Sequence, residues 1–267
     1  MTDKLGTEVM LGLNQMEEPK SSIGVFTLPC GYLVPETNEL ITEVEVREIT
    51  GREEDMLASK QIPNETKMTA LIAGCIVRLG TITERAKLVA IADDLLLGDR
   101  VFLLFAIRRV SLGNELSVRE TCPECKKKHL YVVDLEEELA IKPMPDPRTR
   151  VYDYVLPTGR TVRFRVSNGR DEQRVARIMK KQRNDTLSAM ILMRVELLDG
   201  EAPTLDKIKA LSMRDRHALR TEFNRVEGGV DTALDFTCPD PECEHEWSKD
   251  LDLGTAGFFF PSEESKT

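Results

Sequence analysis

The sequence predicts an α+β protein made of two related copies, each with a β-hairpin, a helical segment and a strand–knuckle–strand unit, which is half of a zinc ribbon. Two observations support this fold class. Similar short motifs recur in the same order along the chain, and each series ends in a closely spaced pair of cysteines. We expect an N-terminal arm at 1–21, the first copy at 22–145, the second copy at 150–260 and a polar tail at 261–267.

Four motifs define the repeat. A Leu-Pro-x-Gly segment comes first, then Gly-Arg followed by two acidic residues, then an Asp-Arg pair, and last the cysteine knuckle. The motifs begin at Leu28, Gly51, Asp99 and Thr121 in the first copy, and at Leu156, Gly169, Asp215 and Thr237 in the second. In both copies the Asp-Arg pair precedes the Thr-Cys-Pro triplet by 22 residues. We expect the Asp-Arg pairs on helix surfaces or at helix contacts.

Each copy is expected to begin with a hairpin. In the second copy Val162, Phe164 and Val166 alternate with arginines after a Pro-Thr-Gly turn, which is the period of a half-buried strand. The first copy has a longer version of this hairpin around residues 41–46. Two further short strands are expected in each copy, one entering and one leaving the knuckle.

Helices are expected between the hairpin and the knuckle of each copy. Thr50 and Glu53 have the spacing of a capping box, and Asn168 and Asp171 are its weaker counterpart. The longest apolar run, at 101–107, is flanked by arginines and predicts a buried helix, since a membrane span needs about 20 apolar residues. In the second copy the helices are expected at 170–183, 206–211 and 214–226.

The composition narrows the function classes. Of 267 residues, 41% are apolar and 31% are charged, so the chain can bury a core. The net charge of −9 argues against a nucleic-acid backbone as the main partner. The N-terminus has no basic segment leading into an apolar stretch, so no secretory signal is expected. A reducing compartment follows, where closely spaced cysteines are more often metal ligands than disulfides.

The candidate metal ligands are Cys122, Cys125, Cys238 and Cys243. Four thiolates are the number that a closed structural zinc site uses, so we expect one zinc ion shared by the two knuckles. The main rival for a C-x-x-C motif is a redox pair. That motif belongs at the start of a helix, whereas here the pair lies between two expected strands.

His129 and His245 are competing ligands, because each follows its local cysteine pair by a few residues. Each copy could then hold its own metal with two cysteines and one histidine, leaving the open position of a catalytic zinc. We favour the shared site, which would clamp the ends of the two copies together. The other interpretation of both histidines is a surface residue on a short strand.

No other catalytic pattern is present. The sequence has no glycine-rich phosphate loop, nucleophile elbow or His-Glu-x-x-His motif, so we expect no enzyme activity. Cys30 and Cys75 are expected to be small buried hydrophobes. The run Lys126-Lys127-Lys128 resembles a nucleic-acid finger, but on an acidic chain a solvated turn is the better interpretation.

Phe258, Phe259 and Phe260 are the candidate partner-binding residues. Neighbouring side chains of a strand point to opposite sides, so three adjacent aromatics cannot all face one core from a strand. The segment is therefore either wedged between layers of this protein or docked on another protein, and both interpretations remain open.

The chain resembles the T4-type phage baseplate proteins, described as the baseplate hub subunit or the hub assembly chaperone of contractile tails. The likeness spans roughly residues 22–260, and its specificity lies in the order of short motifs. The motifs are Phe26-Thr27-Leu28-Pro29-Cys30-Gly31, residues 46–55, Leu95-Leu96-Leu97-Gly98-Asp99-Arg100, Thr121-Cys122-Pro123-Glu124-Cys125 and Val155-Leu156-Pro157-Thr158-Gly159-Arg160.

The resemblance implies a non-enzymatic role in building or forming the central hub of a tail, with hub, spike and tape-measure proteins as neighbours. It implies a location in the host cytoplasm during assembly, and in the tail baseplate of the virion if the protein is retained. It supplies no functional residues, so the zinc assignment depends on cysteine spacing. The rival functions are a zinc-ribbon adaptor that contacts nucleic acid and a metal-dependent enzyme.

Overall fold

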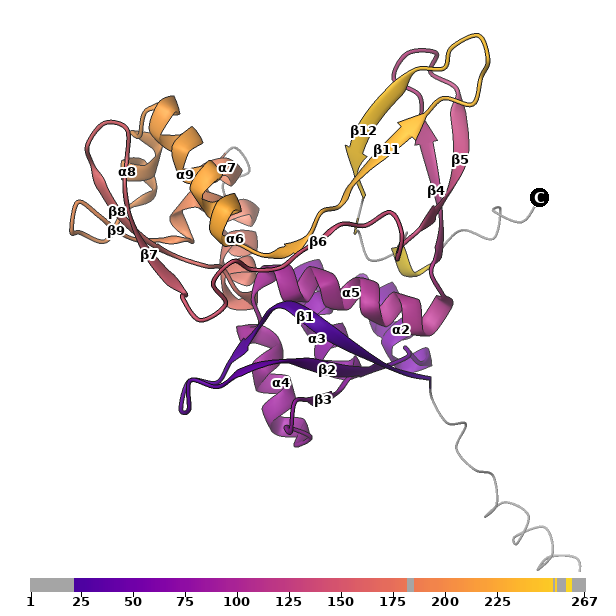
Figure 1. The fold of residues 1–267 in the computed structure, drawn as a ribbon, viewed down its shortest axis with the longest axis horizontal. Coiled ribbons are helices and arrows are strands. Elements are labelled where there is room, and N and C mark those ends of the chain that lie inside the picture. Colours follow the sequence, from indigo (N-terminus) through magenta and orange to yellow (C-terminus); the bar gives the residue numbers. More distant parts are fainter. Residues whose placement is uncertain (1–21, 182–184, 252, 254–257, 261–267) are drawn as a thin grey trace, which may run out of the picture.

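A computed structural model describes residues 22–181, 185–251, 253 and 258–260. The expected N-terminal arm and polar tail lie outside this described part of the chain. Helices alternate with several small antiparallel sheets, so the predicted α+β class is confirmed. Three bodies are visible: two lobes of mixed helices and strands, and a projection made of two hairpins (Figure 1). Within the described residues, no helix is long and apolar enough to cross a membrane.

The first lobe consists of an antiparallel sheet in the order β1-β2-β3 and four helices. Its strands are β1 (Ile23–Leu33), β2 (Leu40–Arg47) and β3 (Ile76–Leu79). Its helices are α2 (Gly51–Ala58), α3 (Asn64–Cys75), α4 (Arg85–Asp94) and α5 (Leu97–Leu112). The predicted capping box at the start of α2 is present, because Glu53 Oε2 accepts a hydrogen bond from Thr50 N at 2.9 Å.

The second lobe has the same elements in the same order. Its sheet has the order β7-β8-β9. Its strands are β7 (Val151–Val155), β8 (Thr161–Arg165) and β9 (Val195–Leu198). Its helices are α6 (Gly169–Lys181), α7 (Thr186–Leu192), α8 (Leu205–Lys209) and α9 (Met213–Val226).

The two sheets also agree in detail. Val44 pairs with Leu79 in the first sheet, and Val162 pairs with Leu198 in the second. One register shift follows in each, between Glu45 and Val46 and between Arg163 and Phe164. The third strand of each sheet continues into a tight turn closed by a single β-bridge, Leu79 to Ile82 and Leu198 to Glu201. Strand register, irregularity and turn therefore correspond element by element.

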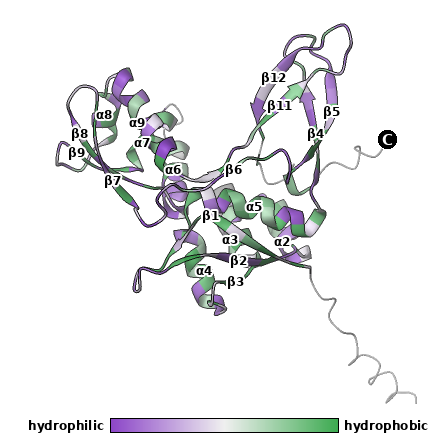
Figure 2. Cartoon of the chain, viewed as in Figure 1, coloured by the Kyte–Doolittle hydropathy of each residue, from purple (hydrophilic) through white to green (hydrophobic). Residues whose placement is uncertain are grey.

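Each lobe has its own hydrophobic core. The larger core centres on α5, whose residues 102–108 are all buried, as the apolar run predicts. The smaller core packs β8 and β9 against α8 and α9. Hydrophobic stretches run along β1, β2 and α5, whereas α9 carries many hydrophilic residues (Figure 2). The core of the first lobe thus includes more residues than that of the second.

The lobes contact each other closely where the α4–α5 junction meets the start of α6. Gly169 N donates a hydrogen bond to Leu95 O at 3.2 Å. Gly98 lies so close to Gly228 that a Cβ on Gly98 would be 2.1 Å from the Gly228 carbonyl oxygen. A glycine is therefore required at this crossing, because any side chain would collide with backbone.

The two hairpins leave their own lobes and pack against each other; we call them the hairpin arm. The hairpins are β4 (Glu115–Thr121) with β5 (Lys128–Asp134), and β11 (Ala233–Thr237) with β12 (Glu246–Asp250). A two-residue ladder between β6 (Ile141–Lys142) and β10 (Gly229–Val230) joins the connections at the base. Leu234 and Phe236 of the second hairpin belong to the core of the first lobe. The hairpin arm therefore packs a hairpin from the second half of the chain against the first lobe.

Candidate metal centre

Each cysteine pair lies in the turn of one hairpin of the arm. The last ladder pairs are Thr121 with Lys128 and Thr237 with Glu246, so the knuckles begin immediately beyond the strands. Within the turns, Cys122 N donates to Lys127 O and Cys238 N donates to His245 O, both at 2.9 Å. Lys126 and Glu244 adopt left-handed φ angles of 62° and 44°, which bend the chain back toward the second strand.

The four thiols of the two knuckles converge. All four Sγ atoms lie within 4.8 Å of one another. Two of the contacts cross between the hairpins: Cys122 to Cys243 and Cys125 to Cys238, each with an Sγ–Sγ distance of 3.7 Å. A tetrahedral zinc with Zn–S bonds of about 2.3 Å separates its sulfur atoms by about 3.8 Å. The four residues therefore fit a closed four-sulfur metal site.

The thiol electrostatics also suit a cation. Removal from water would raise the pKa of Cys122, but backbone N–H groups of Cys125 and Glu124 point at its sulfur and lower the pKa to about 7. Desolvation and the neighbouring sulfur atoms raise the pKa of Cys238 to about 12. One thiolate thus forms readily near neutral pH, whereas four adjacent thiolates require a bound cation.

The hairpins are held together by more than the thiols. Below the knuckles the Tyr131 ring packs edge-on against Phe236 at 5.0 Å and Trp247 at 6.1 Å between centroids. Lys249 pairs with Glu120 across the hairpins at 2.7 Å. The four cysteines therefore lie on two hairpins whose facing surfaces already fit each other. This fit reduces the entropy cost of bringing the four ligands together.

The histidines lie beside the thiol cluster. His129 Nε2 is 3.6 Å from Cys238 Sγ, on the opposite knuckle, and the ring of His245 stacks on Trp247 at 6.2 Å. Within the described residues, the cluster that could hold a metal contains cysteines only. The geometry therefore offers one site between the knuckles, with His129 next to it, and it does not assemble separate two-cysteine sites.

The aromatic segment near the end of the chain packs into the first lobe. Phe258 and Phe259 are buried and Phe260 is half-buried. The Phe258 ring meets Phe105 edge-on at 5.2 Å, and Arg108 donates from Nε to Phe258 O at 3.0 Å. Of the two arrangements left open by the sequence, the structure has the one in which the segment is wedged into this protein. The rings of Phe258 and Phe259 are buried in the first lobe. Both can face one core because this segment is a helical turn and not a strand.

A repeated arginine clamp at the helix starts was not recognised from the sequence. Arg47 holds Glu53 through two contacts of 2.8 and 3.2 Å, and Arg165 holds Asp171 through two contacts of 2.5 and 2.6 Å. Burial alone would raise the pKa of Glu53, but Arg47 and Thr50 lower it to about 2. The first acidic residue of each Gly-Arg motif is thus engaged in structure, and the sequence signal for the clamp is an arginine six residues upstream of it.

The Asp-Arg pairs are buried in both lobes. Asp99 and Arg100 have no exposed surface, and the corresponding Asp215 and Arg216 are also buried. Each arginine donates from NH1 to a backbone carbonyl eight residues earlier in the chain. Each aspartate accepts a backbone N–H from the Leu-Pro-x-Gly turn of its own lobe. These pairs therefore fix the hairpin to the long helix.

The two remaining cysteines are buried away from the cluster, as expected. Cys30 and Cys75 are free and inaccessible. Burial raises the pKa of Cys30 and raises that of Cys75 to about 12, so both remain neutral thiols. They act as core residues.

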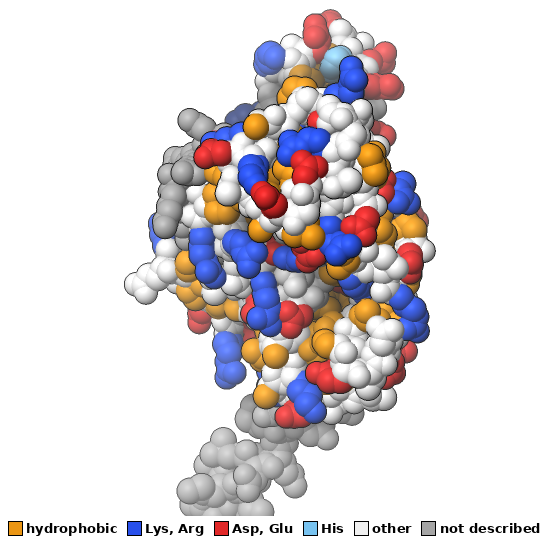
Figure 3. Space-filling model, turned by 90° about the vertical axis from the view of Figure 1, so that its left-hand side faces the viewer, with side chains coloured by type: hydrophobic (Ala, Val, Ile, Leu, Met, Phe, Trp, Pro, Cys, Tyr) orange, Lys and Arg blue, Asp and Glu red, His pale blue; other side chains and the backbone are white. Residues whose placement is uncertain are grey.

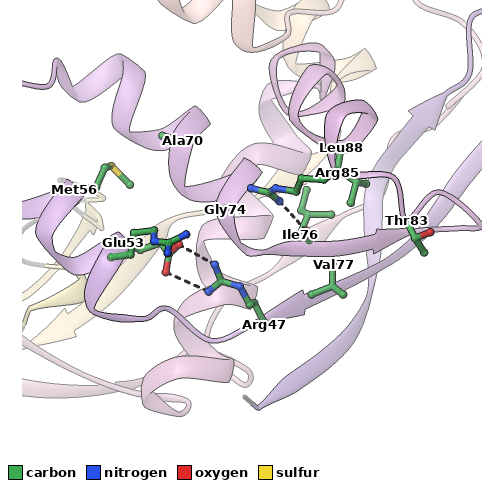
Figure 4. Close-up of a pocket in the computed structure, with 11 residues that line it drawn as sticks. Arg47, Glu53, Met56, Ala70, Gly74, Ile76, Val77, Thr83, Arg85 and Leu88 are labelled. Carbon is green, nitrogen blue, oxygen red and sulfur yellow. Dashed lines mark hydrogen bonds and ion pairs between the residues drawn. The ribbon is translucent and has the colours of Figure 1, made fainter. Parts of the chain in front are cut away.

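A cavity of about 550 Å³ lies between α2, α3 and the start of α4 (Figure 4). Its lining includes Arg47, Glu53 and Arg85. The single lining carboxyl, Glu53, already binds Arg47, and Arg85 extends toward the Ile76 carbonyl oxygen at 3.5 Å. No histidine or cysteine lines the cavity.

Comparison with known proteins identifies the class. The chain is a two-lobed α+β protein with a four-thiol cluster at the turns of two hairpins that pack against each other. The family model described as T4 bacteriophage base plate protein matches residues 30–260, which is most of the chain. The chain therefore belongs to the T4 baseplate family, and the resemblance seen in the sequence is confirmed. No curated protein and no solved structure shows a significant match.

Proposed function

We propose that this protein is a non-enzymatic structural or assembly protein of the hub region of a contractile-tail baseplate, acting through protein–protein contacts. The family match over residues 30–260 is the observation that carries the proposal. Family membership supports a role in the baseplate of the phage tail. The hub location, and hub, spike and tape-measure proteins as neighbours, are the finer part of the proposal.

We further propose that the two lobes and their hairpins are copies of one duplicated unit. The support is the shared order of elements, the shared position of the register shift and the shared arginine clamps. The first clamp joins Arg47 to Glu53 and the second joins Arg165 to Asp171, at the same spacing of six residues. Independent origins would have to reproduce both the strand register and the buried side-chain pairs.

The proposed role of the thiol cluster is to bind one structural zinc ion through Cys122, Cys125, Cys238 and Cys243. Sulfur–sulfur distances of 3.7 Å support this assignment. The ion would supply a tetrahedral link between the two hairpins. Because ligands from both copies contribute, metal binding would add directly to the stability of the folded arm.

The surface around the knuckles favours a protein partner over nucleic acid. Of the lysine run, Lys127 pairs with Asp240 of the opposite knuckle. The same knuckle carries exposed acidic residues at Glu242, Glu244 and Glu246. These carboxylates offset the attraction of the lysines for a phosphate backbone. An enzyme is likewise disfavoured, because a four-sulfur site keeps no open coordination position.

Affinity purification of the tagged protein from infected cells tests the function. Hub, spike or tape-measure proteins should come with it from the host cytoplasm, and the protein should be detected in purified tails if it is retained. A matched control is a tagged chain in which Cys122 and Cys125 are serine. Recovery of nucleic acid without tail proteins would contradict the proposal.

A further inference from the structure

The lobes of one molecule contact each other through two surfaces with a distinct charge pattern. One is the junction between α4 and α5 of the first lobe, and the other is the first turn of α6. Asp94 pairs with Arg170 through contacts of 2.5 and 2.9 Å, and Arg100 pairs with Glu172 at 2.8 Å. The contact therefore combines exposed and buried ion pairs.

The correspondence of the lobes identifies a second pair of such surfaces that one molecule does not bring together. Since Gly51 corresponds to Gly169, the first turn of α2 corresponds to that of α6. We call residues 51–55 the α2 face. Since Asp99-Arg100 corresponds to Asp215-Arg216, the α8–α9 junction corresponds to the α4–α5 junction. We call residues 209–216 the α8–α9 face.

Both faces are exposed where their counterparts are covered. Gly51 is exposed, whereas Gly169 is buried against the first lobe. Met213 takes the place of the half-buried Leu97 and is 72% exposed, the highest value among the large hydrophobic residues described. A protruding methionine at this position is typical of a contact surface.

The α8–α9 face contains a buried arginine with no acidic partner. Arg216 forms no ion pair with any carboxylate in the described part of the chain, although it occupies the position of Arg100. Removal from water lowers its pKa, so an adjacent carboxylate would stabilise its charge. On the α2 face, Glu54 occupies the position of Glu172, is exposed, and has no ion-pair partner among the described residues.

A second pair of residues, uncharged on one side in the internal contact, has two charged counterparts on the α2 face and the α8–α9 face. Within the molecule Gln173 donates to Asp93 at 2.8 Å. Their counterparts are Asp55 and Lys209, which carry opposite charges and are both exposed. The pair formed by Asp94 and Arg170 has no such equivalent, since alanine stands at position 210. Compared with the internal contact, the corresponding contact gains an ion pair between Asp55 and Lys209 and loses the equivalent of the pair between Asp94 and Arg170.

The lobes also differ in overall charge. Residues 150–230 contain 17 Lys and Arg against 11 Asp and Glu, whereas residues 22–112 contain 10 against 13. Lys and Arg side chains spread over the side of the molecule on which the second lobe lies (Figure 3). The acidic first lobe of one molecule and the basic second lobe of another therefore attract each other.

We propose that the protein associates head to tail, with the α8–α9 face of one molecule docked on the α2 face of a second molecule. This rests on the correspondence of the lobes and not on the metal site or on any tail partner. The contact is heterologous, so each added molecule exposes the same two faces at the ends, and the assembly grows into a ring or a filament.

The contact between molecules differs from the internal one at the crossing. Arg214 stands where the internal contact has Gly98, whose Cβ position has no room beside Gly228. The backbones of two molecules therefore stay further apart, and side chains form the interface. Charge substitutions are consequently the sharpest test.

Sedimentation velocity of the full chain tests the proposal, at low salt over roughly a hundredfold range of concentration. The wild type should form species that increase beyond a dimer. Asp55→Lys and Lys209→Glu should each weaken association by about tenfold or more, because each places like charges opposite one another. Glu36→Lys makes the same charge change away from the interface and should have no effect, because Glu36 is exposed in the turn after β1 and has no ion pair with any described residue.

The exchange of charges makes the test specific. The double variant Asp55→Lys with Lys209→Glu should regain association, and an equal mixture of the two single variants should associate more strongly than either variant alone. Lys209→Glu also breaks the pair between exposed Lys209 and half-buried Asp185, so circular dichroism and thermal unfolding check that the variant is folded. A wild type that stays monomeric at every concentration, or a swap that restores nothing, would overturn the proposal.

Discussion

The two lobes share a scaffold and bury the same Asp-Arg pair, but they differ in the hydrogen bonds that the buried carboxyl receives. Both have an arginine clamp at the first helix and an aspartate that holds the Leu-Pro-x-Gly turn. In the second lobe Asp215 accepts hydrogen bonds from both N and Oγ1 of Thr158. In the first lobe the corresponding turn residue is Cys30, and Asp99 Oδ2 has no partner among the described residues.

That difference shows how the hydrogen-bond donor beside a buried carboxyl decides the direction in which its pKa shifts. A thiol is a weak hydrogen-bond donor, so Cys30 replaces the Thr158 hydroxyl poorly. Burial therefore dominates at Asp99 and raises its pKa to about 6, whereas the Thr158 and Ser212 contacts lower the pKa of Asp215 despite desolvation. The second lobe thus keeps a carboxyl that is stabilised in its charged form, whereas the carboxyl of the first lobe takes up a proton near pH 6.

The largest expected effect comes from breaking the shared thiol cluster. Changing Cys122 and Cys125 to serine should abolish binding of about one zinc per chain and unfold the hairpin arm, since a structural zinc contributes on the order of 10 kcal/mol. Metal analysis and thermal unfolding measure both effects. Changing Cys238 and Cys243 instead should give the same loss, because a shared site needs both hairpins.

The control for this experiment is a cysteine outside the cluster. Cys75→Ala should retain the full zinc content, although it costs some stability because Cys75 is buried. Half of the zinc remaining after either pair is removed would indicate a separate site in each copy. Metal-free wild type with four free thiols would exclude the clamp.

A smaller effect is expected at the buried arginines. Arg100→Met should destabilise the protein by about 3 kcal/mol, because it leaves Glu172 and the carbonyl of Ala92 without their donor. Arg216→Met should cost less, because Arg216 has no carboxylate to leave unpaired among the described residues. Urea unfolding of the two variants compares the lobes directly, and equal losses would show that the Glu172 pair contributes nothing.

Local features of this fold could be predicted from the sequence. The capping box at Thr50, the hairpin around Val162 and the apolar helix at 101–107 all depend on neighbouring residues, and the structure has each of them. The recurrence of a cysteine pair between two short strands predicts that the four cysteines converge, and in the structure their Sγ atoms lie within 4.8 Å of one another.

Features that depend on distant parts of the chain could not be predicted. The third strands β3 and β9 are four residues long and lie between helices, so no alternation marks them. For the aromatic segment at Phe258 the sequence leaves a wedged and a docked arrangement open, and the contact of its backbone with Arg108 joins residues 150 positions apart. The burial of Arg100 likewise depends on Glu172 from the other lobe.

The smallest expected effect is a difference between the two lobes in how the free energy of unfolding depends on pH. Asp99 has a folded pKa of about 6, above its ordinary value, so the native state binds the extra proton and loses stability as pH rises through 6. Asp99→Asn removes this dependence, while Arg150 and Cys30, which face the carboxyl, keep their charge states. The wild type should therefore lose about 1 kcal/mol relative to the variant between pH 5 and pH 8.

The matching substitution in the second lobe should behave in the opposite way. The pKa of Asp215 is lowered, so its stabilising contribution is complete above the ordinary pKa and is lost only as pH falls through the folded value. The stability difference between wild type and Asp215→Asn should then stay constant from pH 5 to pH 8. Urea unfolding at both pH values measures the two differences, and parallel curves for both variants would show that burial does not distinguish the lobes.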